Sequence, residues 1–243
     1  MKSALRLFVL LLLAALSLQL YFVGRIALMA LVDPESTAFE RSELWKIANA
    51  PASLKWQQKW TPYQQLPDSL KRAVIASEDA GFAEHEGVDV EALEKAWDRN
   101  VKAEKRAVQG SGALQAAGKP VKVVGGSTIT QQLAKNLFLS GERTLLRKAQ
   151  ELVLTLLLEA LLGKQRILEI YLNNVEWGNG VFGAEAAAQR YFQKSAARLS
   201  NYEAARLAVM LPRPRYFETR PASGYLAARA GTIAARMPAV ALP

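Results

Sequence analysis

The 243-residue sequence contains no cysteine and only one histidine, His85. The absence of cysteine excludes disulfide scaffolds, thiol nucleophiles, zinc ribbons and iron–sulfur ligation. A single histidine also excludes metal sites built from several histidines, so acid–base chemistry is expected to fall to carboxylates. Acidic residues are fewer than basic ones, 22 against 31, which gives a net charge of +9. Such a balance predicts an anionic partner: nucleic acid, a membrane surface or a phosphate-bearing substrate.

The N-terminus has no charge between residues 7 and 24, a run of 18 residues. As a helix this run would be about 27 Å long, enough to cross a bilayer. Lys2 and Arg6 precede it, which predicts a cytoplasmic N-terminus and an exported remainder. The alternative is a cleaved signal peptide, but the run is long, lacks an A-x-A site and is followed by a second apolar stretch. That stretch, residues 26–32, could lie in the membrane interface or join the folded domain.

The length predicts one domain plus this appendage, with 51% apolar residues to form its core. Residues 1–32 hold three basic and no acidic residues, so the remainder carries a net charge of +6. Apolar spacing is mostly helical and no sustained alternation indicates strands, which predicts a mainly α fold. The expected segments are an anchor at 1–32, a linker at 33–49, helices at 66–80, 89–105, 128–138, 144–162, 164–174, 183–192 and 201–211, a mobile Gly- and Ala-rich loop at 106–124, and a partly helical tail at 216–243.

Two adjacent carboxylates, Glu78 and Asp79, end the apolar helix predicted at 66–80 and are followed by Phe82 and His85. A carboxylate among apolar neighbours has its pKa raised by desolvation, as a general acid or base requires. Glu78 is the better candidate because it lies four residues after Val74, and Asp79 would orient it or cap the following turn. The alternative is an ordinary acidic helix end with a structural histidine.

Paired glycines precede a second candidate segment at residues 125–136. Thr128 and Gln131 match the T-x-x-Q capping box, and the amides of a helix N-terminus bind phosphate. Lys135 and Asn136 follow one to two turns later. The segment lacks the P-loop pattern, and its alternative interpretation is a capped surface helix.

Arg147 and Glu151 are four residues apart in a third segment, so they are expected to pair on one helix face. The alternative is a surface salt bridge. Residues 152–158 are so apolar that this helix is predicted to be buried nearly all round.

Residues 178–183 spell G-x-G-x-x-G, with Glu203 a further 20 residues on. This pattern would indicate a dinucleotide site if a strand preceded it. The preceding residues have helical spacing, which argues against that site and predicts a tight helix–loop–helix connection.

Together these segments resemble the family 51 glycosyltransferases, the peptidoglycan glycosyltransferases, over residues 50–215. The resemblance is carried by long motifs in the family's order: Glu78-Asp79 with Phe82, His85 and Gly87; residues 125–132 with Lys135-Asn136; Arg147-Lys148 with Glu151; and residues 167–169 with 171–173. Two departures are the long loop at 106–124 and Arg213-Pro214 where the family commonly has Asn-Pro.

The resemblance implies a lysozyme-like helical head tethered to the inner membrane, with its catalytic domain in the periplasm. It implies that lipid II is polymerised by transfer of the growing chain to the 4-hydroxyl of the incoming GlcNAc, with release of undecaprenyl pyrophosphate. Glu78 would be the general base, and Glu151 would stabilise the pyrophosphate side. No tightly bound cofactor is implied, although a divalent cation, Mg or Mn, could bind at Glu151. The implied substrate-binding residues are Asp79, Phe82, His85, Ser127, Thr128, Gln131, Gln132, Lys135, Asn136, Arg143, Arg147 and Lys148.

The sequence has no S-x-x-K or K-T-G motif, so the resemblance is to family members without a transpeptidase domain. The expected partners are lipid II, the nascent glycan and the membrane, with division or cell-wall synthases as further candidates and no nucleic acid. One alternative is a membrane-anchored, lysozyme-like lytic enzyme, which would not need the cations at 135–148. Another is a non-catalytic scaffold for cell-wall synthases, against which the pair Glu78 and Glu151 argues.

Overall fold

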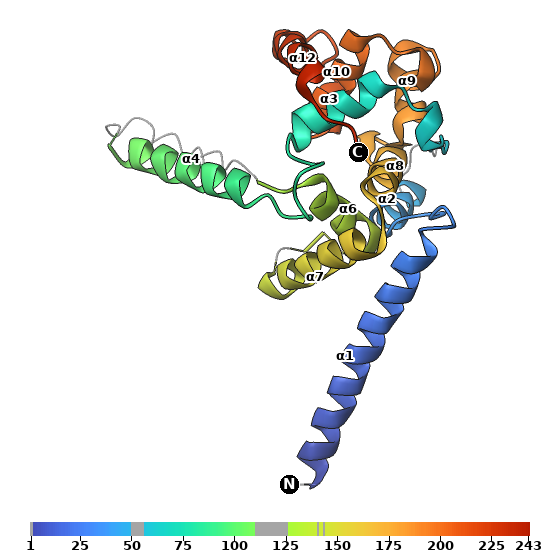
Figure 1. The fold of residues 1–243 in the computed structure, drawn as a ribbon, viewed down its shortest axis with the longest axis vertical. Coiled ribbons are helices and arrows are strands. Elements are labelled where there is room, and N and C mark those ends of the chain that lie inside the picture. Colours follow the sequence, from blue (N-terminus) through green and yellow to red (C-terminus); the bar gives the residue numbers. More distant parts are fainter. Residues whose placement is uncertain (1, 50–55, 110–125, 140, 143) are drawn as a thin grey trace.

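The computed structural model describes residues 2–49, 56–109, 126–139, 141–142 and 144–243. A long N-terminal helix, α1 (Lys2–Leu28), extends from a helical head, and α4 (Val90–Gln109) projects from the head in a different direction (Figure 1). The predicted loop at 106–124 therefore begins inside α4 up to residue 109, and the rest of it lies outside the described residues.

Helix α1 is long and apolar enough to cross a membrane, and most of its leucines are exposed. Its last turns differ, because Phe22 and Ile26 are buried in the core of the head, as is Met29 just after the helix. Phe22 meets Phe138 of α6 edge-on at 5.3 Å between ring centroids. Of the two alternatives for residues 26–32, the first part of the stretch thus joins the folded head, while Leu31 stays exposed.

The stretch expected as a linker contains a helix, α2 (Ala38–Ala48). Thr37 caps it in a full capping box with Glu40, which satisfies amides that a helix start leaves unpaired. Glu40 is buried and accepts a hydrogen bond from Gln58 Nε2 at 2.9 Å, and buried Glu43 pairs with Arg215. These contacts attach α2 to the head.

The head has two groups of helices. In one, α3 (Asp68–Glu78) packs against α10 (Asn201–Met210) and α12 (Gly224–Arg236); in the other, α6 (Ile129–Phe138) packs against α7 (Leu145–Leu161) and α8 (Lys164–Asn174). The predicted boundaries agree to within a residue or two for α3, α6, α7, α8 and α10. The remaining elements are η1 (Tyr63–Gln65), α9 (Ala184–Phe192), η2 (Ala196–Arg198), α11 (Pro214–Glu218) and η3 (Met237–Ala239). Helix α12 lies in the range expected as a tail and packs on the head.

A small sheet forms where a helix–loop–helix connection was expected. Its strands are β1 (Gln57–Gln58), β2 (Glu176–Gly178) and β3 (Val181–Phe182), in the order β1-β3-β2, with β2 and β3 antiparallel. The expected connection was wrong because the glycines allow a tight hairpin: Gly180 has φ +71° and Gly183 φ +81°. This hairpin follows helix α8, so the glycines do not form the strand–turn–helix of a dinucleotide site.

Helix α7 is not buried nearly all round, contrary to the expectation from its composition. Leu154 and Leu158 are fully buried, whereas Leu152 and Leu156 on other faces are 43% and 50% exposed. Helix α7 contacts α1, where Gln150 and Gln19 exchange hydrogen bonds of 3.0 and 3.3 Å. The apolar residues of α7 are divided between a buried face and an exposed one, so apolar content alone overestimated the burial of this helix.

Candidate active site

Glu78 is the last residue of α3 and its carboxyl group is partly buried. One oxygen accepts a hydrogen bond from Ser77 Oγ at 3.1 Å, and the other accepts one from Gln132 Nε2 at 3.3 Å. Burial raises the pKa of Glu78, and the neighbouring Asp79 adds to the rise against the opposing effect of the two hydrogen bonds. A carboxylate with a raised pKa is suited to proton transfer near neutral pH.

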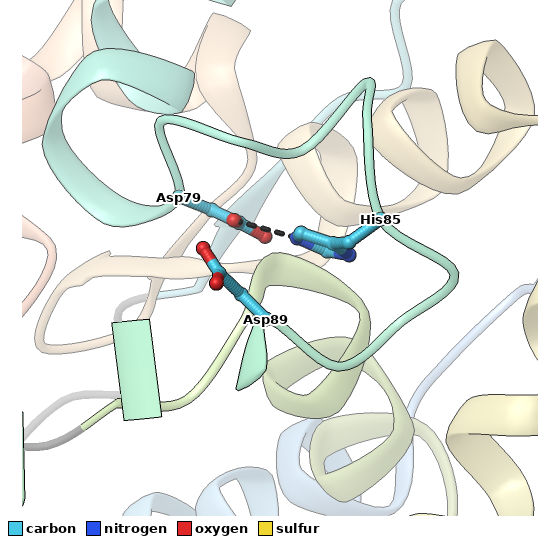
Figure 2. Close-up of side chains that lie close together, drawn as sticks. All are labelled: Asp79, His85 and Asp89. Atoms are coloured by element: carbon cyan, nitrogen blue, oxygen red, sulfur yellow. Dashed lines mark hydrogen bonds and ion pairs between the residues drawn. The ribbon is translucent and has the colours of Figure 1, made fainter. Parts of the chain in front are cut away.

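Asp79 follows directly but points into the protein (Figure 2). Its carboxylate accepts hydrogen bonds from His85 Nε2 at 2.8 Å and from the backbone N–H of Ile129 at 2.9 Å. Gly87 N–H donates to His85 Nδ1 at 3.1 Å, so the ring proton lies on Nε2 and faces Asp79. Burial raises the pKa of Asp79, although both hydrogen bonds oppose the rise. These side-chain contacts match neither of the two roles considered for Asp79, orienting Glu78 or capping the following turn, and instead hold the loop against the first residue of α6.

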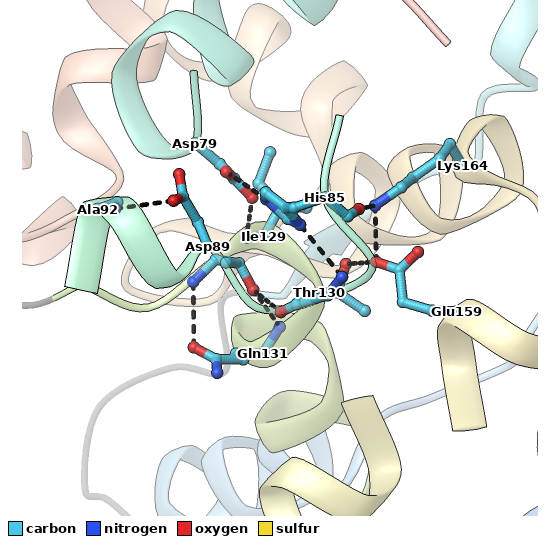
Figure 3. Close-up of polar contacts among 11 residues, drawn as sticks. Asp79, His85, Asp89, Ala92, Ile129, Thr130, Gln131, Glu159 and Lys164 are labelled. Atoms are coloured by element: carbon cyan, nitrogen blue, oxygen red, sulfur yellow. Dashed lines mark hydrogen bonds and ion pairs between the residues drawn. The ribbon is translucent and has the colours of Figure 1, made fainter. Parts of the chain in front are cut away.

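The loop between Asp79 and Gly87 is held in place by a polar network that the sequence did not predict (Figure 3). Lys164 Nζ donates to the backbone oxygen of His85 at 2.5 Å and to Glu159 Oε1 at 2.8 Å, and it lies 4.6 Å from the ring centroid of Phe82. Thr130 Oγ1 also donates to Glu159 Oε1, at 2.6 Å. Phe82 is fully buried. These contacts give Phe82 and His85 a structural role in shaping the loop.

Helix α6 begins as predicted. Thr128 and Gln131 form both hydrogen bonds of the capping box, at 3.1 and 3.2 Å. Thr128 Oγ1 also donates to the backbone oxygen of Gly87 at 2.7 Å, which joins the start of α6 to the Glu78 loop. Four side chains of α6 line the neighbouring cavity: Gln131, Gln132, Lys135 and Asn136.

Glu151 lies nearly two turns into α7 and is only 3% exposed. One of its oxygens pairs with Arg147 Nη1 at 2.9 Å, and the other pairs with Lys148 Nζ. Lys135 of α6 is close enough for Glu151 to stabilise its charge, but burial outweighs this effect and lowers the Lys135 pKa. Arg147 Nε is buried and has no hydrogen-bond partner. Arg143, the remaining predicted phosphate ligand, lies outside the described residues.

Two cavities meet at this site. The first, of about 410 Å³, contains Glu151 with Lys135, Arg147 and Lys148. The second, of about 320 Å³, contains Glu78. Ser127 lines both cavities. The two glutamates expected to be catalytic therefore lie in adjoining cavities.

The second cavity contains cations that sequence reasoning missed: Lys95, Arg99, Arg229 and Arg236. Arg229 favours the charged form of Glu78, against the effect of burial. Arg229 and Arg236 are seven residues apart on α12, and this spacing on a predicted helix places both on one face. The sequence alone therefore contained a signal, the spacing of these two arginines, that could have predicted a cationic face on this helix.

Two groups of side chains are candidates for holding a divalent cation. The ligand atoms of Asp79, His85 and Asp89 lie within 4.8 Å of one another (Figure 2). All three are already engaged, since Asp79 pairs with His85 and Asp89 Oδ1 accepts from Ala92 N–H at 2.7 Å at the start of α4. The second set is Glu151, whose two oxygens face Arg147 and Lys148. A carboxylate surrounded by cations is a poor ligand for Mg or Mn, so this geometry does not fit the cation expected at Glu151.

Comparison with known proteins identifies the group to which this arrangement belongs. The family model described as Transglycosylase matches residues 47–238. The chain belongs to the transglycosylase family. The match includes α12 and so extends beyond the range 50–215 expected from the motifs.

Several curated relatives of this transglycosylase carry the name biosynthetic peptidoglycan transglycosylase. Those from Burkholderia thailandensis and Burkholderia pseudomallei are each 52% identical over 95% of this chain and 84% of their own length. One from Paraburkholderia phytofirmans is 50% identical over 95% of this chain and 89% of its own length. The predicted family, the mainly α fold and the enzyme class, a glycosyltransferase, are confirmed.

Proposed function

We propose that this transglycosylase polymerises lipid II into the glycan strands of peptidoglycan. The observation that carries the proposal is the pair of adjoining cavities, each lined by cations and by one of the two glutamates expected to be catalytic. A polymerase of lipid II has to hold two pyrophosphate-bearing molecules at once, the growing chain as donor and lipid II as acceptor. The first cavity has three cations against two carboxylates and the second has four against four, so each offers cations to one pyrophosphate.

In this proposal the donor pyrophosphate binds beside Lys135, Arg147 and Lys148, and the acceptor occupies the cavity of Glu78. Glu78 takes the proton from the 4-hydroxyl of the acceptor GlcNAc. The oxygen attacks C1 of the donor sugar as the bond from C1 to the pyrophosphate oxygen breaks, and undecaprenyl pyrophosphate leaves with the electron pair. The cations around Glu151 stabilise the negative charge of the leaving pyrophosphate, and Glu151 keeps these cations in position. No step requires a metal ion.

The location follows from α1. The apolar helix anchors the enzyme, and Lys2 and Arg6 at its start favour a cytoplasmic N-terminus. The head would then work on the periplasmic side of the inner membrane, where the apolar face of α7 beside α1 would contact lipid. Division or cell-wall synthases as partners remain a prediction.

The full chain in detergent, incubated with lipid II, is expected to give glycan polymer on a gel. Glu78→Gln should reduce the rate about 100- to 10,000-fold, the usual effect of losing a general base. The exposed Glu84→Gln in the following loop is the matched control and should retain wild-type activity. Cleavage of preformed glycan without polymer would favour the lytic alternative, and full activity of Glu78→Gln would refute the role of Glu78.

A further inference from the structure

Phe39 of α2 lines the cavity of Glu151, although α2 contains none of the motifs that carry the family resemblance. Apart from this ring and Leu139, the described side chains around the cavity are polar or charged. A half-buried aromatic ring beside three cations has a free energy cost in water that an apolar ligand would remove.

The position of Phe39 is well fixed. The capping box of Thr37 and Glu40 surrounds it in sequence, and Glu40 is held in turn by Gln58. The ring meets Phe182 edge-on at 6.1 Å between centroids, and α2 packs against α6. These contacts therefore hold the ring of Phe39 in a fixed position in the cavity wall.

From this placement we infer that Phe39 and Leu139 form a subsite for the first isoprenoid units of the lipid, next to the cations that bind its pyrophosphate. This inference rests on the proposed function, because it assumes a prenyl pyrophosphate in this cavity. In such a ligand the first carbon of the hydrocarbon is bonded directly to the ester oxygen of the pyrophosphate, so an apolar surface has to lie beside the cations. Helix α2 starts ten residues after α1 ends, which places this surface on the side where the chain leaves the membrane.

The test compares two probes on the full chain in one detergent, by calorimetry: farnesyl pyrophosphate and inorganic pyrophosphate. Phe39→Ala should weaken the binding of farnesyl pyrophosphate about tenfold, equivalent to ~1.4 kcal/mol. It should leave the affinity for inorganic pyrophosphate unchanged. Phe39→Leu should keep most of the farnesyl affinity, since it keeps an apolar side chain. Lys135→Ala should weaken the binding of both probes. Phe8→Ala, on the exposed surface of α1, should weaken the binding of neither.

The outcomes separate this inference from the proposed function. If the wild-type protein binds neither probe, the cavity is not a pyrophosphate site and the proposed function fails with it. If Phe39→Ala binds farnesyl pyrophosphate as tightly as the wild type, or loses both probes equally, the isoprenoid subsite is refuted. Normal farnesyl binding with impaired use of lipid II would mean that the ring contacts the sugar instead, which also refutes it.

Discussion

The hydroxyl of Tyr171 donates a hydrogen bond to Gln132 Oε1 at 2.9 Å, and this contact determines which end of the Gln132 amide faces Glu78. With its oxygen engaged, the amide presents its NH₂ group to Glu78 Oε2 at 3.3 Å. Tyr171 is fully buried on α8 and does not line either cavity. It is therefore a positioning residue that acts on Glu78 through Gln132.

Tyr171→Phe should shift the pH profile of polymerisation. Without the phenol, the Gln132 amide is free to turn its oxygen toward Glu78, which disfavours the carboxylate and raises the Glu78 pKa further. A base is active only when ionised, so the acidic limb of kcat/KM should move to higher pH. Losing one hydrogen bond of ~1 kcal/mol corresponds to about 0.7 pH unit.

Tyr191→Phe is the control for this shift. Its hydroxyl is also hydrogen-bonded, to the backbone oxygen of Trp177 at 2.7 Å, but it lines neither cavity that contains a glutamate. It should leave the pH profile in place. A Tyr171→Phe enzyme with reduced activity at every pH and an unmoved acidic limb would show that the phenol is only structural.

Gly87→Ala should destabilise the head. Gly87 has φ +86°, and an added Cβ would lie 2.7 Å from Thr155 Cγ2 and 2.9 Å from Glu159 Cγ. Backbone strain and overpacking of this kind cost about 2–4 kcal/mol together. Because Gly87 also binds Thr128 and His85, loss of its position should reduce activity as well as the melting temperature.

Gly231→Ala provides the matched comparison within α12. Apart from its chain neighbours and the backbone of its own helix, no described atom lies within 4 Å of the added Cβ, and alanine favours a helix interior by about 0.5–1 kcal/mol over glycine. This variant should melt at or above the wild-type temperature. Equal effects of the two substitutions would contradict the close packing assigned to Gly87.

Glu40→Gln should change how stability depends on pH. Burial raises the pKa of Glu40 from 4.5 to about 7, so the folded protein binds a proton that the unfolded chain releases. The contribution of Glu40 to the free energy of unfolding is therefore fully present below pH 4.5. It decreases as pH rises through 7, by up to about 3 kcal/mol. Unfolding followed from pH 5 to pH 8 should show a shallower decrease for Glu40→Gln.

The exposed Glu84→Gln should keep the wild-type slope in the same measurement. The comparison uses slopes because other buried carboxyls, such as Asp79, also have raised pKa values and affect both proteins equally. Parallel curves for Glu40→Gln and the wild type would show that Glu40 is ionised throughout.

Helices with a clear apolar stripe were predictable from the sequence, and α8 was predicted with both its boundaries. Helix α2 was missed because its inward face includes Glu40 and Glu43, and buried carboxylates break the apolar pattern on which helix prediction depends. The hairpin at 176–182 was missed because its strands are only two or three residues long.

The candidate site was predictable as far as its motifs are local. The Thr128–Gln131 capping box and the Arg147–Glu151 pair lie three and four residues apart, so helix geometry alone brings them together. The contact of Lys164 with His85 and that of Tyr171 with Gln132 span 79 and 39 residues. Packing of α8 against α6 creates the contact of Tyr171 with Gln132, and that of Lys164 joins α8 to the loop after α3. No local pattern encodes either contact.

The last turns of α1 belong to the core of the head, and this leaves the enzyme without a pivot at the membrane. Because Phe22 and Ile26 of α1 belong to the core of the head, together with Met29 just after the helix, any tilt of this candidate membrane span has to turn the whole head with it. Apolar helices tilt more in thin bilayers than in thick ones. Bilayer thickness would therefore set the angle at which both cavities face the lipid surface, and polymerisation in vesicles should vary with acyl-chain length.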